Sequence, residues 1–330
     1  MLSPGLLVAC PSSGPPTATA LHVSSAAGPD GDGTQSRPYA SIDEALVRAQ
    51  PGDQVLVASG EYPPFITVRP GTAEAPIRIT GQDARIVGAD GDRVINVTHS
   101  YVTLEGLDIS GGDVLVRIAG AQGVRLLASF LHGADSECVR LRDGTSNVEV
   151  SGNRIERCGL TDFDLDADRK NGEGVYIGVA PEQLGDDPGA SAVAEGNRVS
   201  DNDISVPGEC VDVKEGAVGT QVDANRCTGS QDPDGAGFSS RGDETTFRDN
   251  VSTGHAGAGI RLGGDGPGQG VDNVVIGNRL TGNAGYGLKV ERFPQGEICG
   301  NEITDNDDGV TNGEVDPRRP CPQGARGNRG

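Results

Sequence analysis

Short stretches of alternating apolar and polar residues recur along the second half of the chain. In each of them, a Gly or an acidic residue precedes positions that would point alternately into and out of a β-strand. The stretches lie at residues 137–142, 173–178, 209–214, 236–241, 258–263 and 286–291. This pattern predicts short strands with one buried face, and its recurrence predicts a fold built from repeated units.

An Asn residue that closes a following strand marks the repeats a second time. These residues are Asn153, Asn197, Asn225, Asn250, Asn278 and Asn301, and after Asn197 they are 28, 25, 28 and 23 residues apart. That spacing is about one coil of a β-helix, in which a coil buries its apolar face only by stacking on its neighbours. Because Asn tolerates positive φ and its amide can bond to the next coil, we expect a ladder of Asn side chains at this bend.

Residues 41–50 have the different spacing of an amphipathic helix. Ser41 and Glu44 form a capping-box pattern, and apolar residues at positions 42, 45, 46 and 49 form one stripe. Residues 51–52 (Pro-Gly) would end the helix. The open end of a β-helix exposes unpaired backbone, so we expect this helix to cover the N-terminal end, with the strands beginning at residue 54.

Together these elements predict an all-β protein, a single-stranded right-handed parallel β-helix over residues 21–316 with an N-terminal capping helix. A chain of 330 residues would also accommodate two ordinary domains, but 52 Gly, 3% aromatic residues and no Trp disfavour a conventional aromatic-rich core. Residues 1–20 are expected to be a signal remnant and linker, and residues 317–330 a C-terminal tail.

The N-terminus and the cysteines indicate where the protein works. Residues 7–10 (Leu-Val-Ala-Cys) are similar to the end of a bacterial lipoprotein signal, with Cys10 as the lipid-attachment site; the alternative is a disordered segment without function. The six other cysteines fall into pairs about one coil apart, Cys138/Cys158, Cys210/Cys227 and Cys299/Cys321. Such partners would lie within disulfide reach on adjacent coils, with reduced core cysteines as the alternative. We therefore expect an extracellular or cell-surface protein, secreted or held by a lipid anchor.

The formal net charge of -21 limits the binding partners. It argues against general binding to nucleic acid or to anionic membranes, because the mean field would repel both, and it fits an exported protein that holds calcium. The sequence has no run of about 18 apolar residues, so no transmembrane segment is expected. We expect a monomer whose partner is an acidic polysaccharide, because the chain has no Trp to stack on neutral sugars, whereas Arg and Lys can hold anionic ones.

Equivalent outward residues of successive strands would lie about 4.8 Å apart, in columns along the β-helix. The first column contains Glu137, Glu173 and Glu209; the second Arg140, Tyr176, Asp212, Ser239, Arg261 and Lys289; the third Arg142, Gly178, Lys214, Arg241, Gly263 and Glu291. Stacked carboxylates repel one another unless a cation binds, and calcium, which accepts six to eight oxygen ligands, is the predicted metal. The alternative is that the charges pair across the columns on a solvated face.

Residues 208–214 (Gly-Glu-Cys-Val-Asp-Val-Lys), followed one coil later by Arg241, resemble the chondroitinase B and alginate lyase family of β-helical polysaccharide lyases. In that family, a Glu five residues before a Lys binds calcium, the Lys is the catalytic base, and an Arg on the next coil is the proposed acid. Glu209, Lys214 and Arg241 occupy these three positions. The resemblance therefore implies the family's fold and its chemistry.

The resemblance extends beyond this segment but is not complete. Residues 171–178 are similar to the family's earlier Gly-Glu coil, and residues 33–62 resemble the entry region of many pectate-lyase-like β-helices. The chain departs from the family at Pro207, where a second acid is usual, and at Gly242, where a His often follows the Arg.

This resemblance implies a lyase that cleaves a uronic-acid-containing polysaccharide by calcium-assisted β-elimination. The predicted metal ligands are Glu173, Glu209 and Asp212, the predicted catalytic residues are Lys214 and Arg241, and the predicted substrate-binding residues are Arg140, Arg142, Arg261 and Lys289. Calcium would acidify the C5 hydrogen, Lys214 would remove it, and Arg241 would serve the leaving oxygen. Because an ordinary Lys is protonated at neutral pH, we expect Arg142 and Arg241 to lower the pKa of Lys214.

Two other functions would use the same residues. A C5-epimerase removes the same proton and returns it to the other face of the sugar, so the polymer is converted without cleavage. A non-catalytic glycan-binding surface β-helix would hold the polymer through its cations and release no product.

Two further features are candidates for function. The acidic residues between 162 and 173 have the spacing of a calcium-binding loop, although Ala167 replaces the Gly of the turn; the alternative is a solvated acidic loop. His255 follows Arg241 by about one coil and could reach the same face, with a structural histidine as the alternative.

Overall fold

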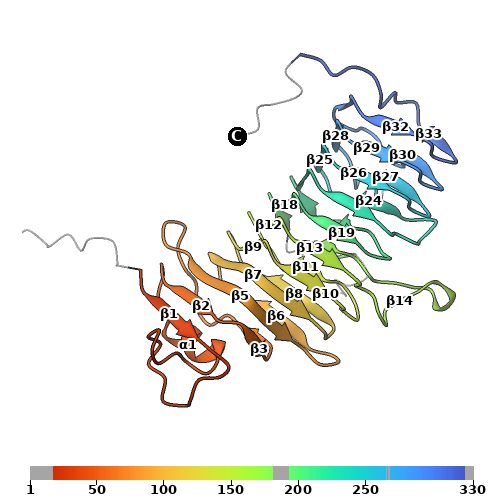
Figure 1. The fold of residues 1–330 in the computed structure, drawn as a ribbon. Helices are drawn as coiled ribbons and strands as arrows, with labels where there is room; N and C mark the ends of the chain where they lie inside the picture. Colours follow the sequence, from red (N-terminus) through yellow and green to blue (C-terminus); the bar gives the residue numbers. More distant parts are fainter. Residues whose placement is uncertain (1–17, 181–192, 265, 267, 324–330) are drawn as a thin grey trace, which may run out of the picture.

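The computed structural model describes residues 18–180, 193–264, 266 and 268–323, and it shows a parallel β-helix of stacked coils (Figure 1). The strands of successive coils pair in parallel, from β1 (Ala20–Val23) at one end to β33 (Gly309–Thr311) at the other. The predicted right-handed parallel β-helix is confirmed. The predicted lipid-attachment residue Cys10 and residues 1–17 and 324–330 lie outside the described residues.

Two long sheets form the faces of the β-helix. The ten-stranded sheet contains β4 (Phe65–Ile66), β6 (Arg93–Val97), β8 (Val114–Ala119), β11 (Val139–Arg142), β16 (Val175–Ile177), β20 (Val211–Val213), β24 (Ala236–Ser240), β27 (Ala258–Leu262), β30 (Tyr286–Val290) and β33. The nineteen-stranded sheet contains β1, β2 (Gln54–Val57), β3 (Gly60–Tyr62), β5 (Ile77–Val87), β7 (Val102–Ser110), β9 (Arg125–Leu127), β10 (Phe130–His132), β12 (Glu149–Ser151), β13 (Arg154–Glu156), β18 (Arg198–Ser200), β19 (Asp203–Ser205), β22 (Gln221–Asp223), β23 (Arg226–Thr228), β25 (Thr246–Arg248), β26 (Val251–Thr253), β28 (Val274–Ile276), β29 (Arg279–Thr281), β31 (Ile298–Cys299) and β32 (Glu302–Thr304). Two small pairs complete the strands, antiparallel β14 (Phe163–Asp164) with β15 (Arg169–Lys170) and parallel β17 (Ala194–Glu195) with β21 (Ala217–Val218).

Stacked side chains fill the interior, one from each coil at each inward position. In the ten-stranded sheet, one inward column consists of Val116, Val139, Val175, Val211, Phe238, Ile260 and Leu288, all fully buried. The strand register also confirms the second predicted outward column, Arg140, Tyr176, Asp212, Ser239, Arg261 and Lys289. Stacking of the core therefore fixes the outward residues of adjacent coils at the spacing of paired strands.

A ladder of buried Asn side chains runs along one bend of the nineteen-stranded sheet. Its members are Asn153, Asn202, Asn225, Asn250, Asn278 and Asn301. From Asn202 on, each Oδ1 accepts two hydrogen bonds from the preceding member, one from its backbone N–H and one from its side-chain amide. The predicted ladder is confirmed, but Asn197 is not a member. It lies in a neighbouring bend, where its Oδ1 accepts from the N–H of Val148 at 3.0 Å. The sequence around Asn197 matches that around Asn153, so periodicity alone places it in the wrong bend.

The N-terminal end is covered by α1 (Ile42–Arg48), which lies against β1, β2 and β4. Ser41 Oγ accepts a hydrogen bond from the N–H of Glu44 at 3.2 Å, and the apolar stripe of the helix is buried. The predicted capping helix is confirmed. The expected start of the strands at residue 54 is wrong, because β1 precedes the helix and pairs with β2.

Three disulfides join neighbouring segments of the coils. They are Cys138–Cys158, Cys210–Cys227 and Cys299–Cys321, with Cα–Cα distances of 5.4, 5.8 and 5.0 Å. The three predicted pairs are confirmed. Within the described residues, no helix has the length and apolar character needed to span a membrane.

Candidate metal and active site

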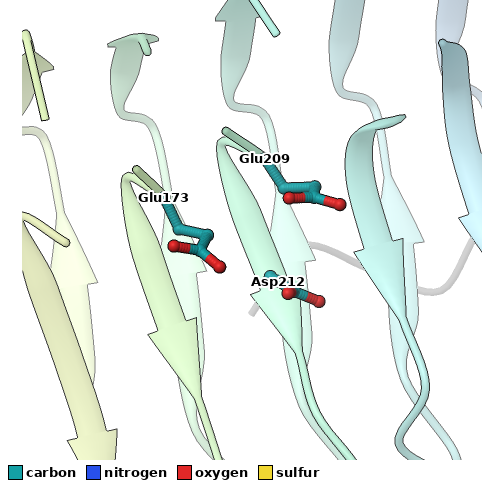
Figure 2. Close-up of side chains that lie close together, drawn as sticks. All are labelled: Glu173, Glu209 and Asp212. Carbon is teal, nitrogen blue, oxygen red and sulfur yellow. The ribbon is translucent and has the colours of Figure 1, made fainter. Parts of the chain in front are cut away.

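Three carboxylates converge on the outer face of the ten-stranded sheet, and Figure 2 shows them projecting to the same side of two adjacent coils. Glu173 precedes β16, Glu209 precedes β20, and Asp212 is the middle residue of β20. One ligand oxygen from each residue lies within 4.8 Å of those of the other two. The three residues expose only 3%, 9% and 1% of their surface, so this acidic cluster is buried.

Close approach of the two coils brings the glutamates together. The N–H of Gly208 donates to the carbonyl of Gly172 at 3.2 Å, and the N–H of Gly174 donates to that of Glu209 at 3.0 Å. A Cβ on Gly208 would lie 2.7 Å from the carbonyl carbon of Gly172, so this approach requires Gly. On the other side of Glu209, a Cβ on Gly235 would lie 3.1 Å from Oε1. The backbone therefore leaves little freedom for the Glu209 carboxylate.

Lys214 supplies positive charge to the acidic cluster. Its Nζ forms an ion pair with Asp212 and lies 5.0 Å from the centre of the Tyr176 ring. Arg241 follows β24 on the next coil, and its charge acts on both Lys214 and Glu209. The structure thus brings the predicted metal ligands and the two predicted catalytic residues into one site.

Burial changes the protonation of the carboxylates. It raises the pKa of Glu173 to about 8 against the opposing charge of Lys214, with the neighbouring carboxylates adding to the rise. Burial and then the charge of Asp212 raise the pKa of Glu209 to about 7. Burial likewise raises the pKa of Tyr176 to about 12. Near neutral pH, the cluster therefore retains protons that a bound cation would displace.

The atoms of the acidic cluster fit a hard cation. Oδ1 of Asp212 is buried without a hydrogen-bond partner among the described residues, and so is Oγ of Ser239, the next residue of its column. Buried polar atoms without partners are costly, which is why they mark ligand positions. In the described part of the chain, this is the one group of three or more such ligands, and all are carboxylates. Calcium prefers such donors, and Glu173, Glu209 and Asp212 would hold it.

The expectation that neighbouring arginines lower the pKa of Lys214 is wrong for this structure. Burial and Arg241 do act in that direction, but the surrounding carboxylates, Asp212 above all, outweigh them and raise the pKa. Arg142 lies two coils away in the third column and contacts Asp143 at 3.0 Å. Lys214 is therefore a charged ammonium paired with Asp212.

The four cations predicted to bind substrate lie on the same sheet and have acidic partners. The ion pairs are Arg140 with Glu137, Arg142 with Asp143 at 3.0 Å, and Arg261 and Lys289 with Glu291 at 2.5 and 3.1 Å. Glu137 is therefore committed to Arg140 and does not join the acidic cluster. Pairing between columns, the alternative to ligand binding, accounts for part of the charge on this face.

Arg117 belongs to the same outward column as Arg140, one coil earlier on β8, and the repeat pattern missed it. Its guanidinium contacts Asp143 at 2.6 Å, and its side chain is 16% exposed. Residues 114–119 alternate like the later repeats, but residues 114–115 (Val-Leu) contain neither the acidic residue nor the Gly that precedes the later strands. The alternation was the available signal, and the absence of both markers concealed it.

The acidic segment at 162–173 is a hairpin that projects beyond the coils, where Figure 1 labels β14. Asp164 accepts hydrogen bonds from the N–H groups of Asp166 and Ala167 at 3.1 and 3.2 Å, and it pairs with Arg169 at 3.0 Å. Apart from Glu173, its acids belong to no metal-ligand group among the described residues. The segment is an acidic hairpin, and calcium binding by it stays a prediction.

His255 is buried inside the β-helix, with 2% of its surface exposed. Its Nδ1 accepts from the N–H of Ser230 at 3.2 Å, and its own N–H donates to Oδ1 of Asn283 at 3.1 Å. Burial lowers the pKa of His255 to about 4. The expectation that His255 reaches the outer face is wrong, because it occupies a ladder position in the interior.

Comparison with known proteins supports the fold. A family model described as Periplasmic copper-binding protein (NosD) matches residues 168–315, and no curated protein matches the sequence significantly. Among solved structures, an alginate lyase from Paenibacillus sp. str. FPU-7 is similar with a TM-score of 0.72 and 21% identity, over 89% of this chain and 98% of the lyase. A pectate lyase has a TM-score of 0.61 and 12% identity, over 90% and 82% of the two chains. A protein of Geobacillus virus E2 has a TM-score of 0.63 and 14% identity, over 91% and 59%.

These likenesses have low sequence identity, so they establish architecture and leave the chemistry to the site itself. They extend over about nine-tenths of this chain. The fold of this chain is a parallel β-helix, similar to the folds of these solved structures.

Proposed function

We propose that the protein is a polysaccharide lyase that cleaves an acidic, uronic-acid-containing polysaccharide by calcium-assisted β-elimination. The observation that carries this proposal is the buried cluster of Glu173, Glu209 and Asp212 beside Lys214 and Arg241. The alginate and pectate lyases among the similar structures act on acidic polymers, which agrees with it.

The residues of the site divide the reaction between them. β-Elimination removes the C5 proton, forms a double bond between C4 and C5, and breaks the bond from C4 to the glycosidic oxygen, which takes up a proton. Bound calcium would supply positive charge to the C6 carboxylate and so acidify the C5 hydrogen. Lys214 is the base, and Arg241 or a water that it orients serves the leaving oxygen.

Lys214 acts as a base only when its amine is neutral. Burial and Arg241 favour the neutral amine, whereas the ion pair with Asp212 favours the ammonium. Engagement of the Asp212 carboxylate by another partner would remove the largest opposing interaction. The carboxylate cluster therefore controls the base as well as the charge of the site.

The donor atoms favour calcium over copper, although the matching family model has a copper-binding description. Copper is usually bound by imidazole, thiolate or thioether groups, whereas this cluster offers only carboxylates. Calcium accepts carboxylate oxygens in flexible arrangements. Equilibrium dialysis with each metal separates the two possibilities. The assignment would be contradicted if the protein bound copper more tightly than calcium and if the Asp212→Asn variant still bound copper.

The test is the ultraviolet absorbance of the new C4–C5 double bond. The full chain is mixed with alginate, pectate, glucuronan and glycosaminoglycans, with calcium or with EDTA. We expect a calcium-dependent rise on one of these polymers, abolished in Lys214→Ala. Lys289→Ala serves as the matched lysine variant and should retain turnover with a raised KM. Calcium-independent absorbance, or equal activity in Lys214→Ala, would contradict the proposal.

A non-catalytic glycan-binding role is the second candidate. The specific observation in its favour is that Lys214 is a charged ammonium paired with Asp212, which suits anion binding better than proton removal. Under this role, a polymer of the panel binds but gives no double bond, and Lys214→Ala weakens binding no more than Arg261→Ala.

A further inference from the structure

The ten-stranded sheet has a second charged region on the coils before the acidic cluster. Arg117 on β8 and Arg140 and Arg142 on β11 form this region, called here the arginine cluster. Arg117 pairs in register with Arg140, and the three side chains are 16%, 19% and 24% exposed. Three guanidiniums are thus partly buried on two adjacent coils.

The arginine cluster has more positive than negative charge. Its acidic contacts among the described residues are Glu137, which pairs with Arg140, and Asp143, which Arg117 and Arg142 share. Nε of Arg140 is also buried without a hydrogen-bond partner in the described structure. Three cations therefore share two carboxylates, and one donor remains for a ligand.

Mutual repulsion acts on the arginines of this cluster. Burial lowers the pKa of Arg117, Asp143 opposes this, and the charges of Arg93, Arg142 and Arg140 lower the pKa further. An arginine stays charged in proteins, so the repulsion persists in the folded state. An additional anion would relieve it.

Asp143 is the exchangeable partner in this arrangement. It follows β11 in the left-handed conformation, at φ 59°, and its side chain is 44% exposed, more than those of the arginines that it contacts. A carboxylate on a ligand could replace it on Arg117 or Arg142 without breaking a backbone hydrogen bond of the coil. Glu137, by contrast, is fully buried and stays with Arg140.

We propose that the arginine cluster is a subsite that binds a carboxylate or sulfate of an acidic polysaccharide, on a sugar distant from the one at the acidic cluster. In the outward column, Arg140 is two coils and Arg117 three coils before Asp212, or about 10 and 14 Å at strand spacing. The preferred polymer therefore carries acidic groups on more than one sugar. The inference rests on the proposed function only for the class of ligand.

Tyr176 connects this subsite to the acidic cluster. Its ring lies 5.1 Å from Cζ of Arg140 and 5.0 Å from Nζ of Lys214. The column of Arg140 and Tyr176 continues to Asp212, so a polymer that follows it would reach the acidic cluster, with Lys214 beside it in the neighbouring column.

Equilibrium binding in EDTA tests the subsite apart from calcium-dependent cleavage. Oligosaccharides of alginate, pectate, glucuronan and chondroitin sulfate are titrated into the full chain by calorimetry, with carboxyl-reduced pectate oligosaccharide as the neutral ligand. Arg117→Ala removes a proposed contact. Arg125→Ala is its matched control, because Arg125 also pairs with one carboxylate, Glu149 at 2.7 Å, but lies on the nineteen-stranded sheet.

We expect Arg117→Ala to weaken binding of an acidic oligosaccharide about tenfold, as for loss of one charge-assisted hydrogen bond. Asp143→Asn should strengthen binding about threefold, because it removes the competing carboxylate. A gain of affinity does not arise from damage to the fold. Arg125→Ala should bind like the wild type.

Three results would overturn the subsite. They are no binding of any acidic oligosaccharide in EDTA, equal weakening by Arg117→Ala and Arg125→Ala, and equal binding of the carboxyl-reduced ligand. Absence of the ultraviolet product together with Arg117-dependent binding would refute the lyase and support the subsite. Calcium-dependent cleavage in which Arg117→Ala leaves the KM for long oligosaccharides unchanged would support the lyase and refute the subsite.

Discussion

Two arrays of buried polar residues run through the same β-helix, and they differ in how fully their hydrogen bonds are satisfied. In the Asn ladder, the amide of Asn250 donates to Val222 and Asn278, and its Oδ1 accepts two bonds from Asn225. In the acidic cluster, Asp212 has a buried oxygen without a hydrogen-bond partner among the described residues. One array stabilises the stack of coils, and the other holds charge at a cost to the fold.

This difference separates structural from functional polar residues in a repeating fold. Satisfied polar networks contribute to stability, whereas buried groups with unsatisfied atoms and raised pKa values concentrate at binding and catalytic sites. We therefore expect changes to the ladder to lower stability and changes to the cluster to raise stability while removing function.

The largest effect should come from the ladder. Asn250→Ala removes four hydrogen bonds and leaves buried groups of both neighbouring coils unpaired. We expect the free energy of unfolding to fall by about 4 kcal/mol, measured by urea denaturation. Asn96→Ala is the control, because within the described residues the side-chain amide of Asn96 has one hydrogen bond, which its Oδ1 accepts from Arg117 at 3.4 Å. Equal losses in both variants would show that the ladder is not a special source of stability.

The acidic cluster should make the stability of the protein depend on pH. The folded pKa values of Glu173 and Glu209, about 8 and 7, lie above the unfolded value, so the folded state binds more protons. Without a divalent cation, their effect is to lower stability as pH rises from about 4.5 to 8, by several kcal/mol at about 1.4 kcal/mol per pKa unit.

Urea denaturation in EDTA at several pH values measures this dependence. The Glu173→Gln variant should gain stability relative to the wild type as the pH rises through this range. The exposed acid variant Glu302→Gln, 62% exposed beside Arg279, should follow the wild type. A constant difference between wild type and Glu173→Gln at all pH values would contradict the raised pKa.

Bound calcium should give the unsatisfied carboxylate oxygens of the acidic cluster a partner and so remove their cost to stability. At a free calcium concentration of 100 times Kd, stability should rise by about 2.7 kcal/mol. Asp212→Asn should abolish most of this gain, whereas Asn96→Ala should retain it. Thermal unfolding with calcium, magnesium or EDTA provides the measurement, and an equal gain in Asp212→Asn would place the cation elsewhere.

The fold could be predicted from the sequence because stacking repeats the same requirement in every coil. The inward alternation, the capping stripe beginning at Ile42 and the cysteine spacing all follow from local patterns. Asn197 shows the limit: the chain around it matches that around Asn153, and only pairing between coils reveals that the two lie in different bends. Periodicity identifies a repeat more reliably than the bend to which a residue belongs.

The sequence predicted which residues lie together at the candidate site but not their electrostatics. Strand register follows from alternation, so Glu173, Asp212 and Lys214 could be aligned by counting. The sign of the pKa shift of Lys214 depends on which charges contact it, and an ion pair with Asp212 has no periodic signature. Arg117 was missed because its coil has neither the acidic residue nor the Gly that precedes the later strands.

The smallest effect at neutral pH should come from His255, which stands in a ladder position that Asn283 and Asn306 occupy in the following coils. His255→Asn should change the free energy of unfolding by less than about 1 kcal/mol at pH 7, because Asn supplies an equivalent acceptor for Ser230. The folded pKa of His255, about 4, lies below the unfolded value, so the wild type loses stability as the pH falls from about 6.5 to 4. The variant has no such loss and should become the more stable protein near pH 5. Urea denaturation at both pH values measures the crossover, and its absence would mean that His255 is accessible to protons in the folded state.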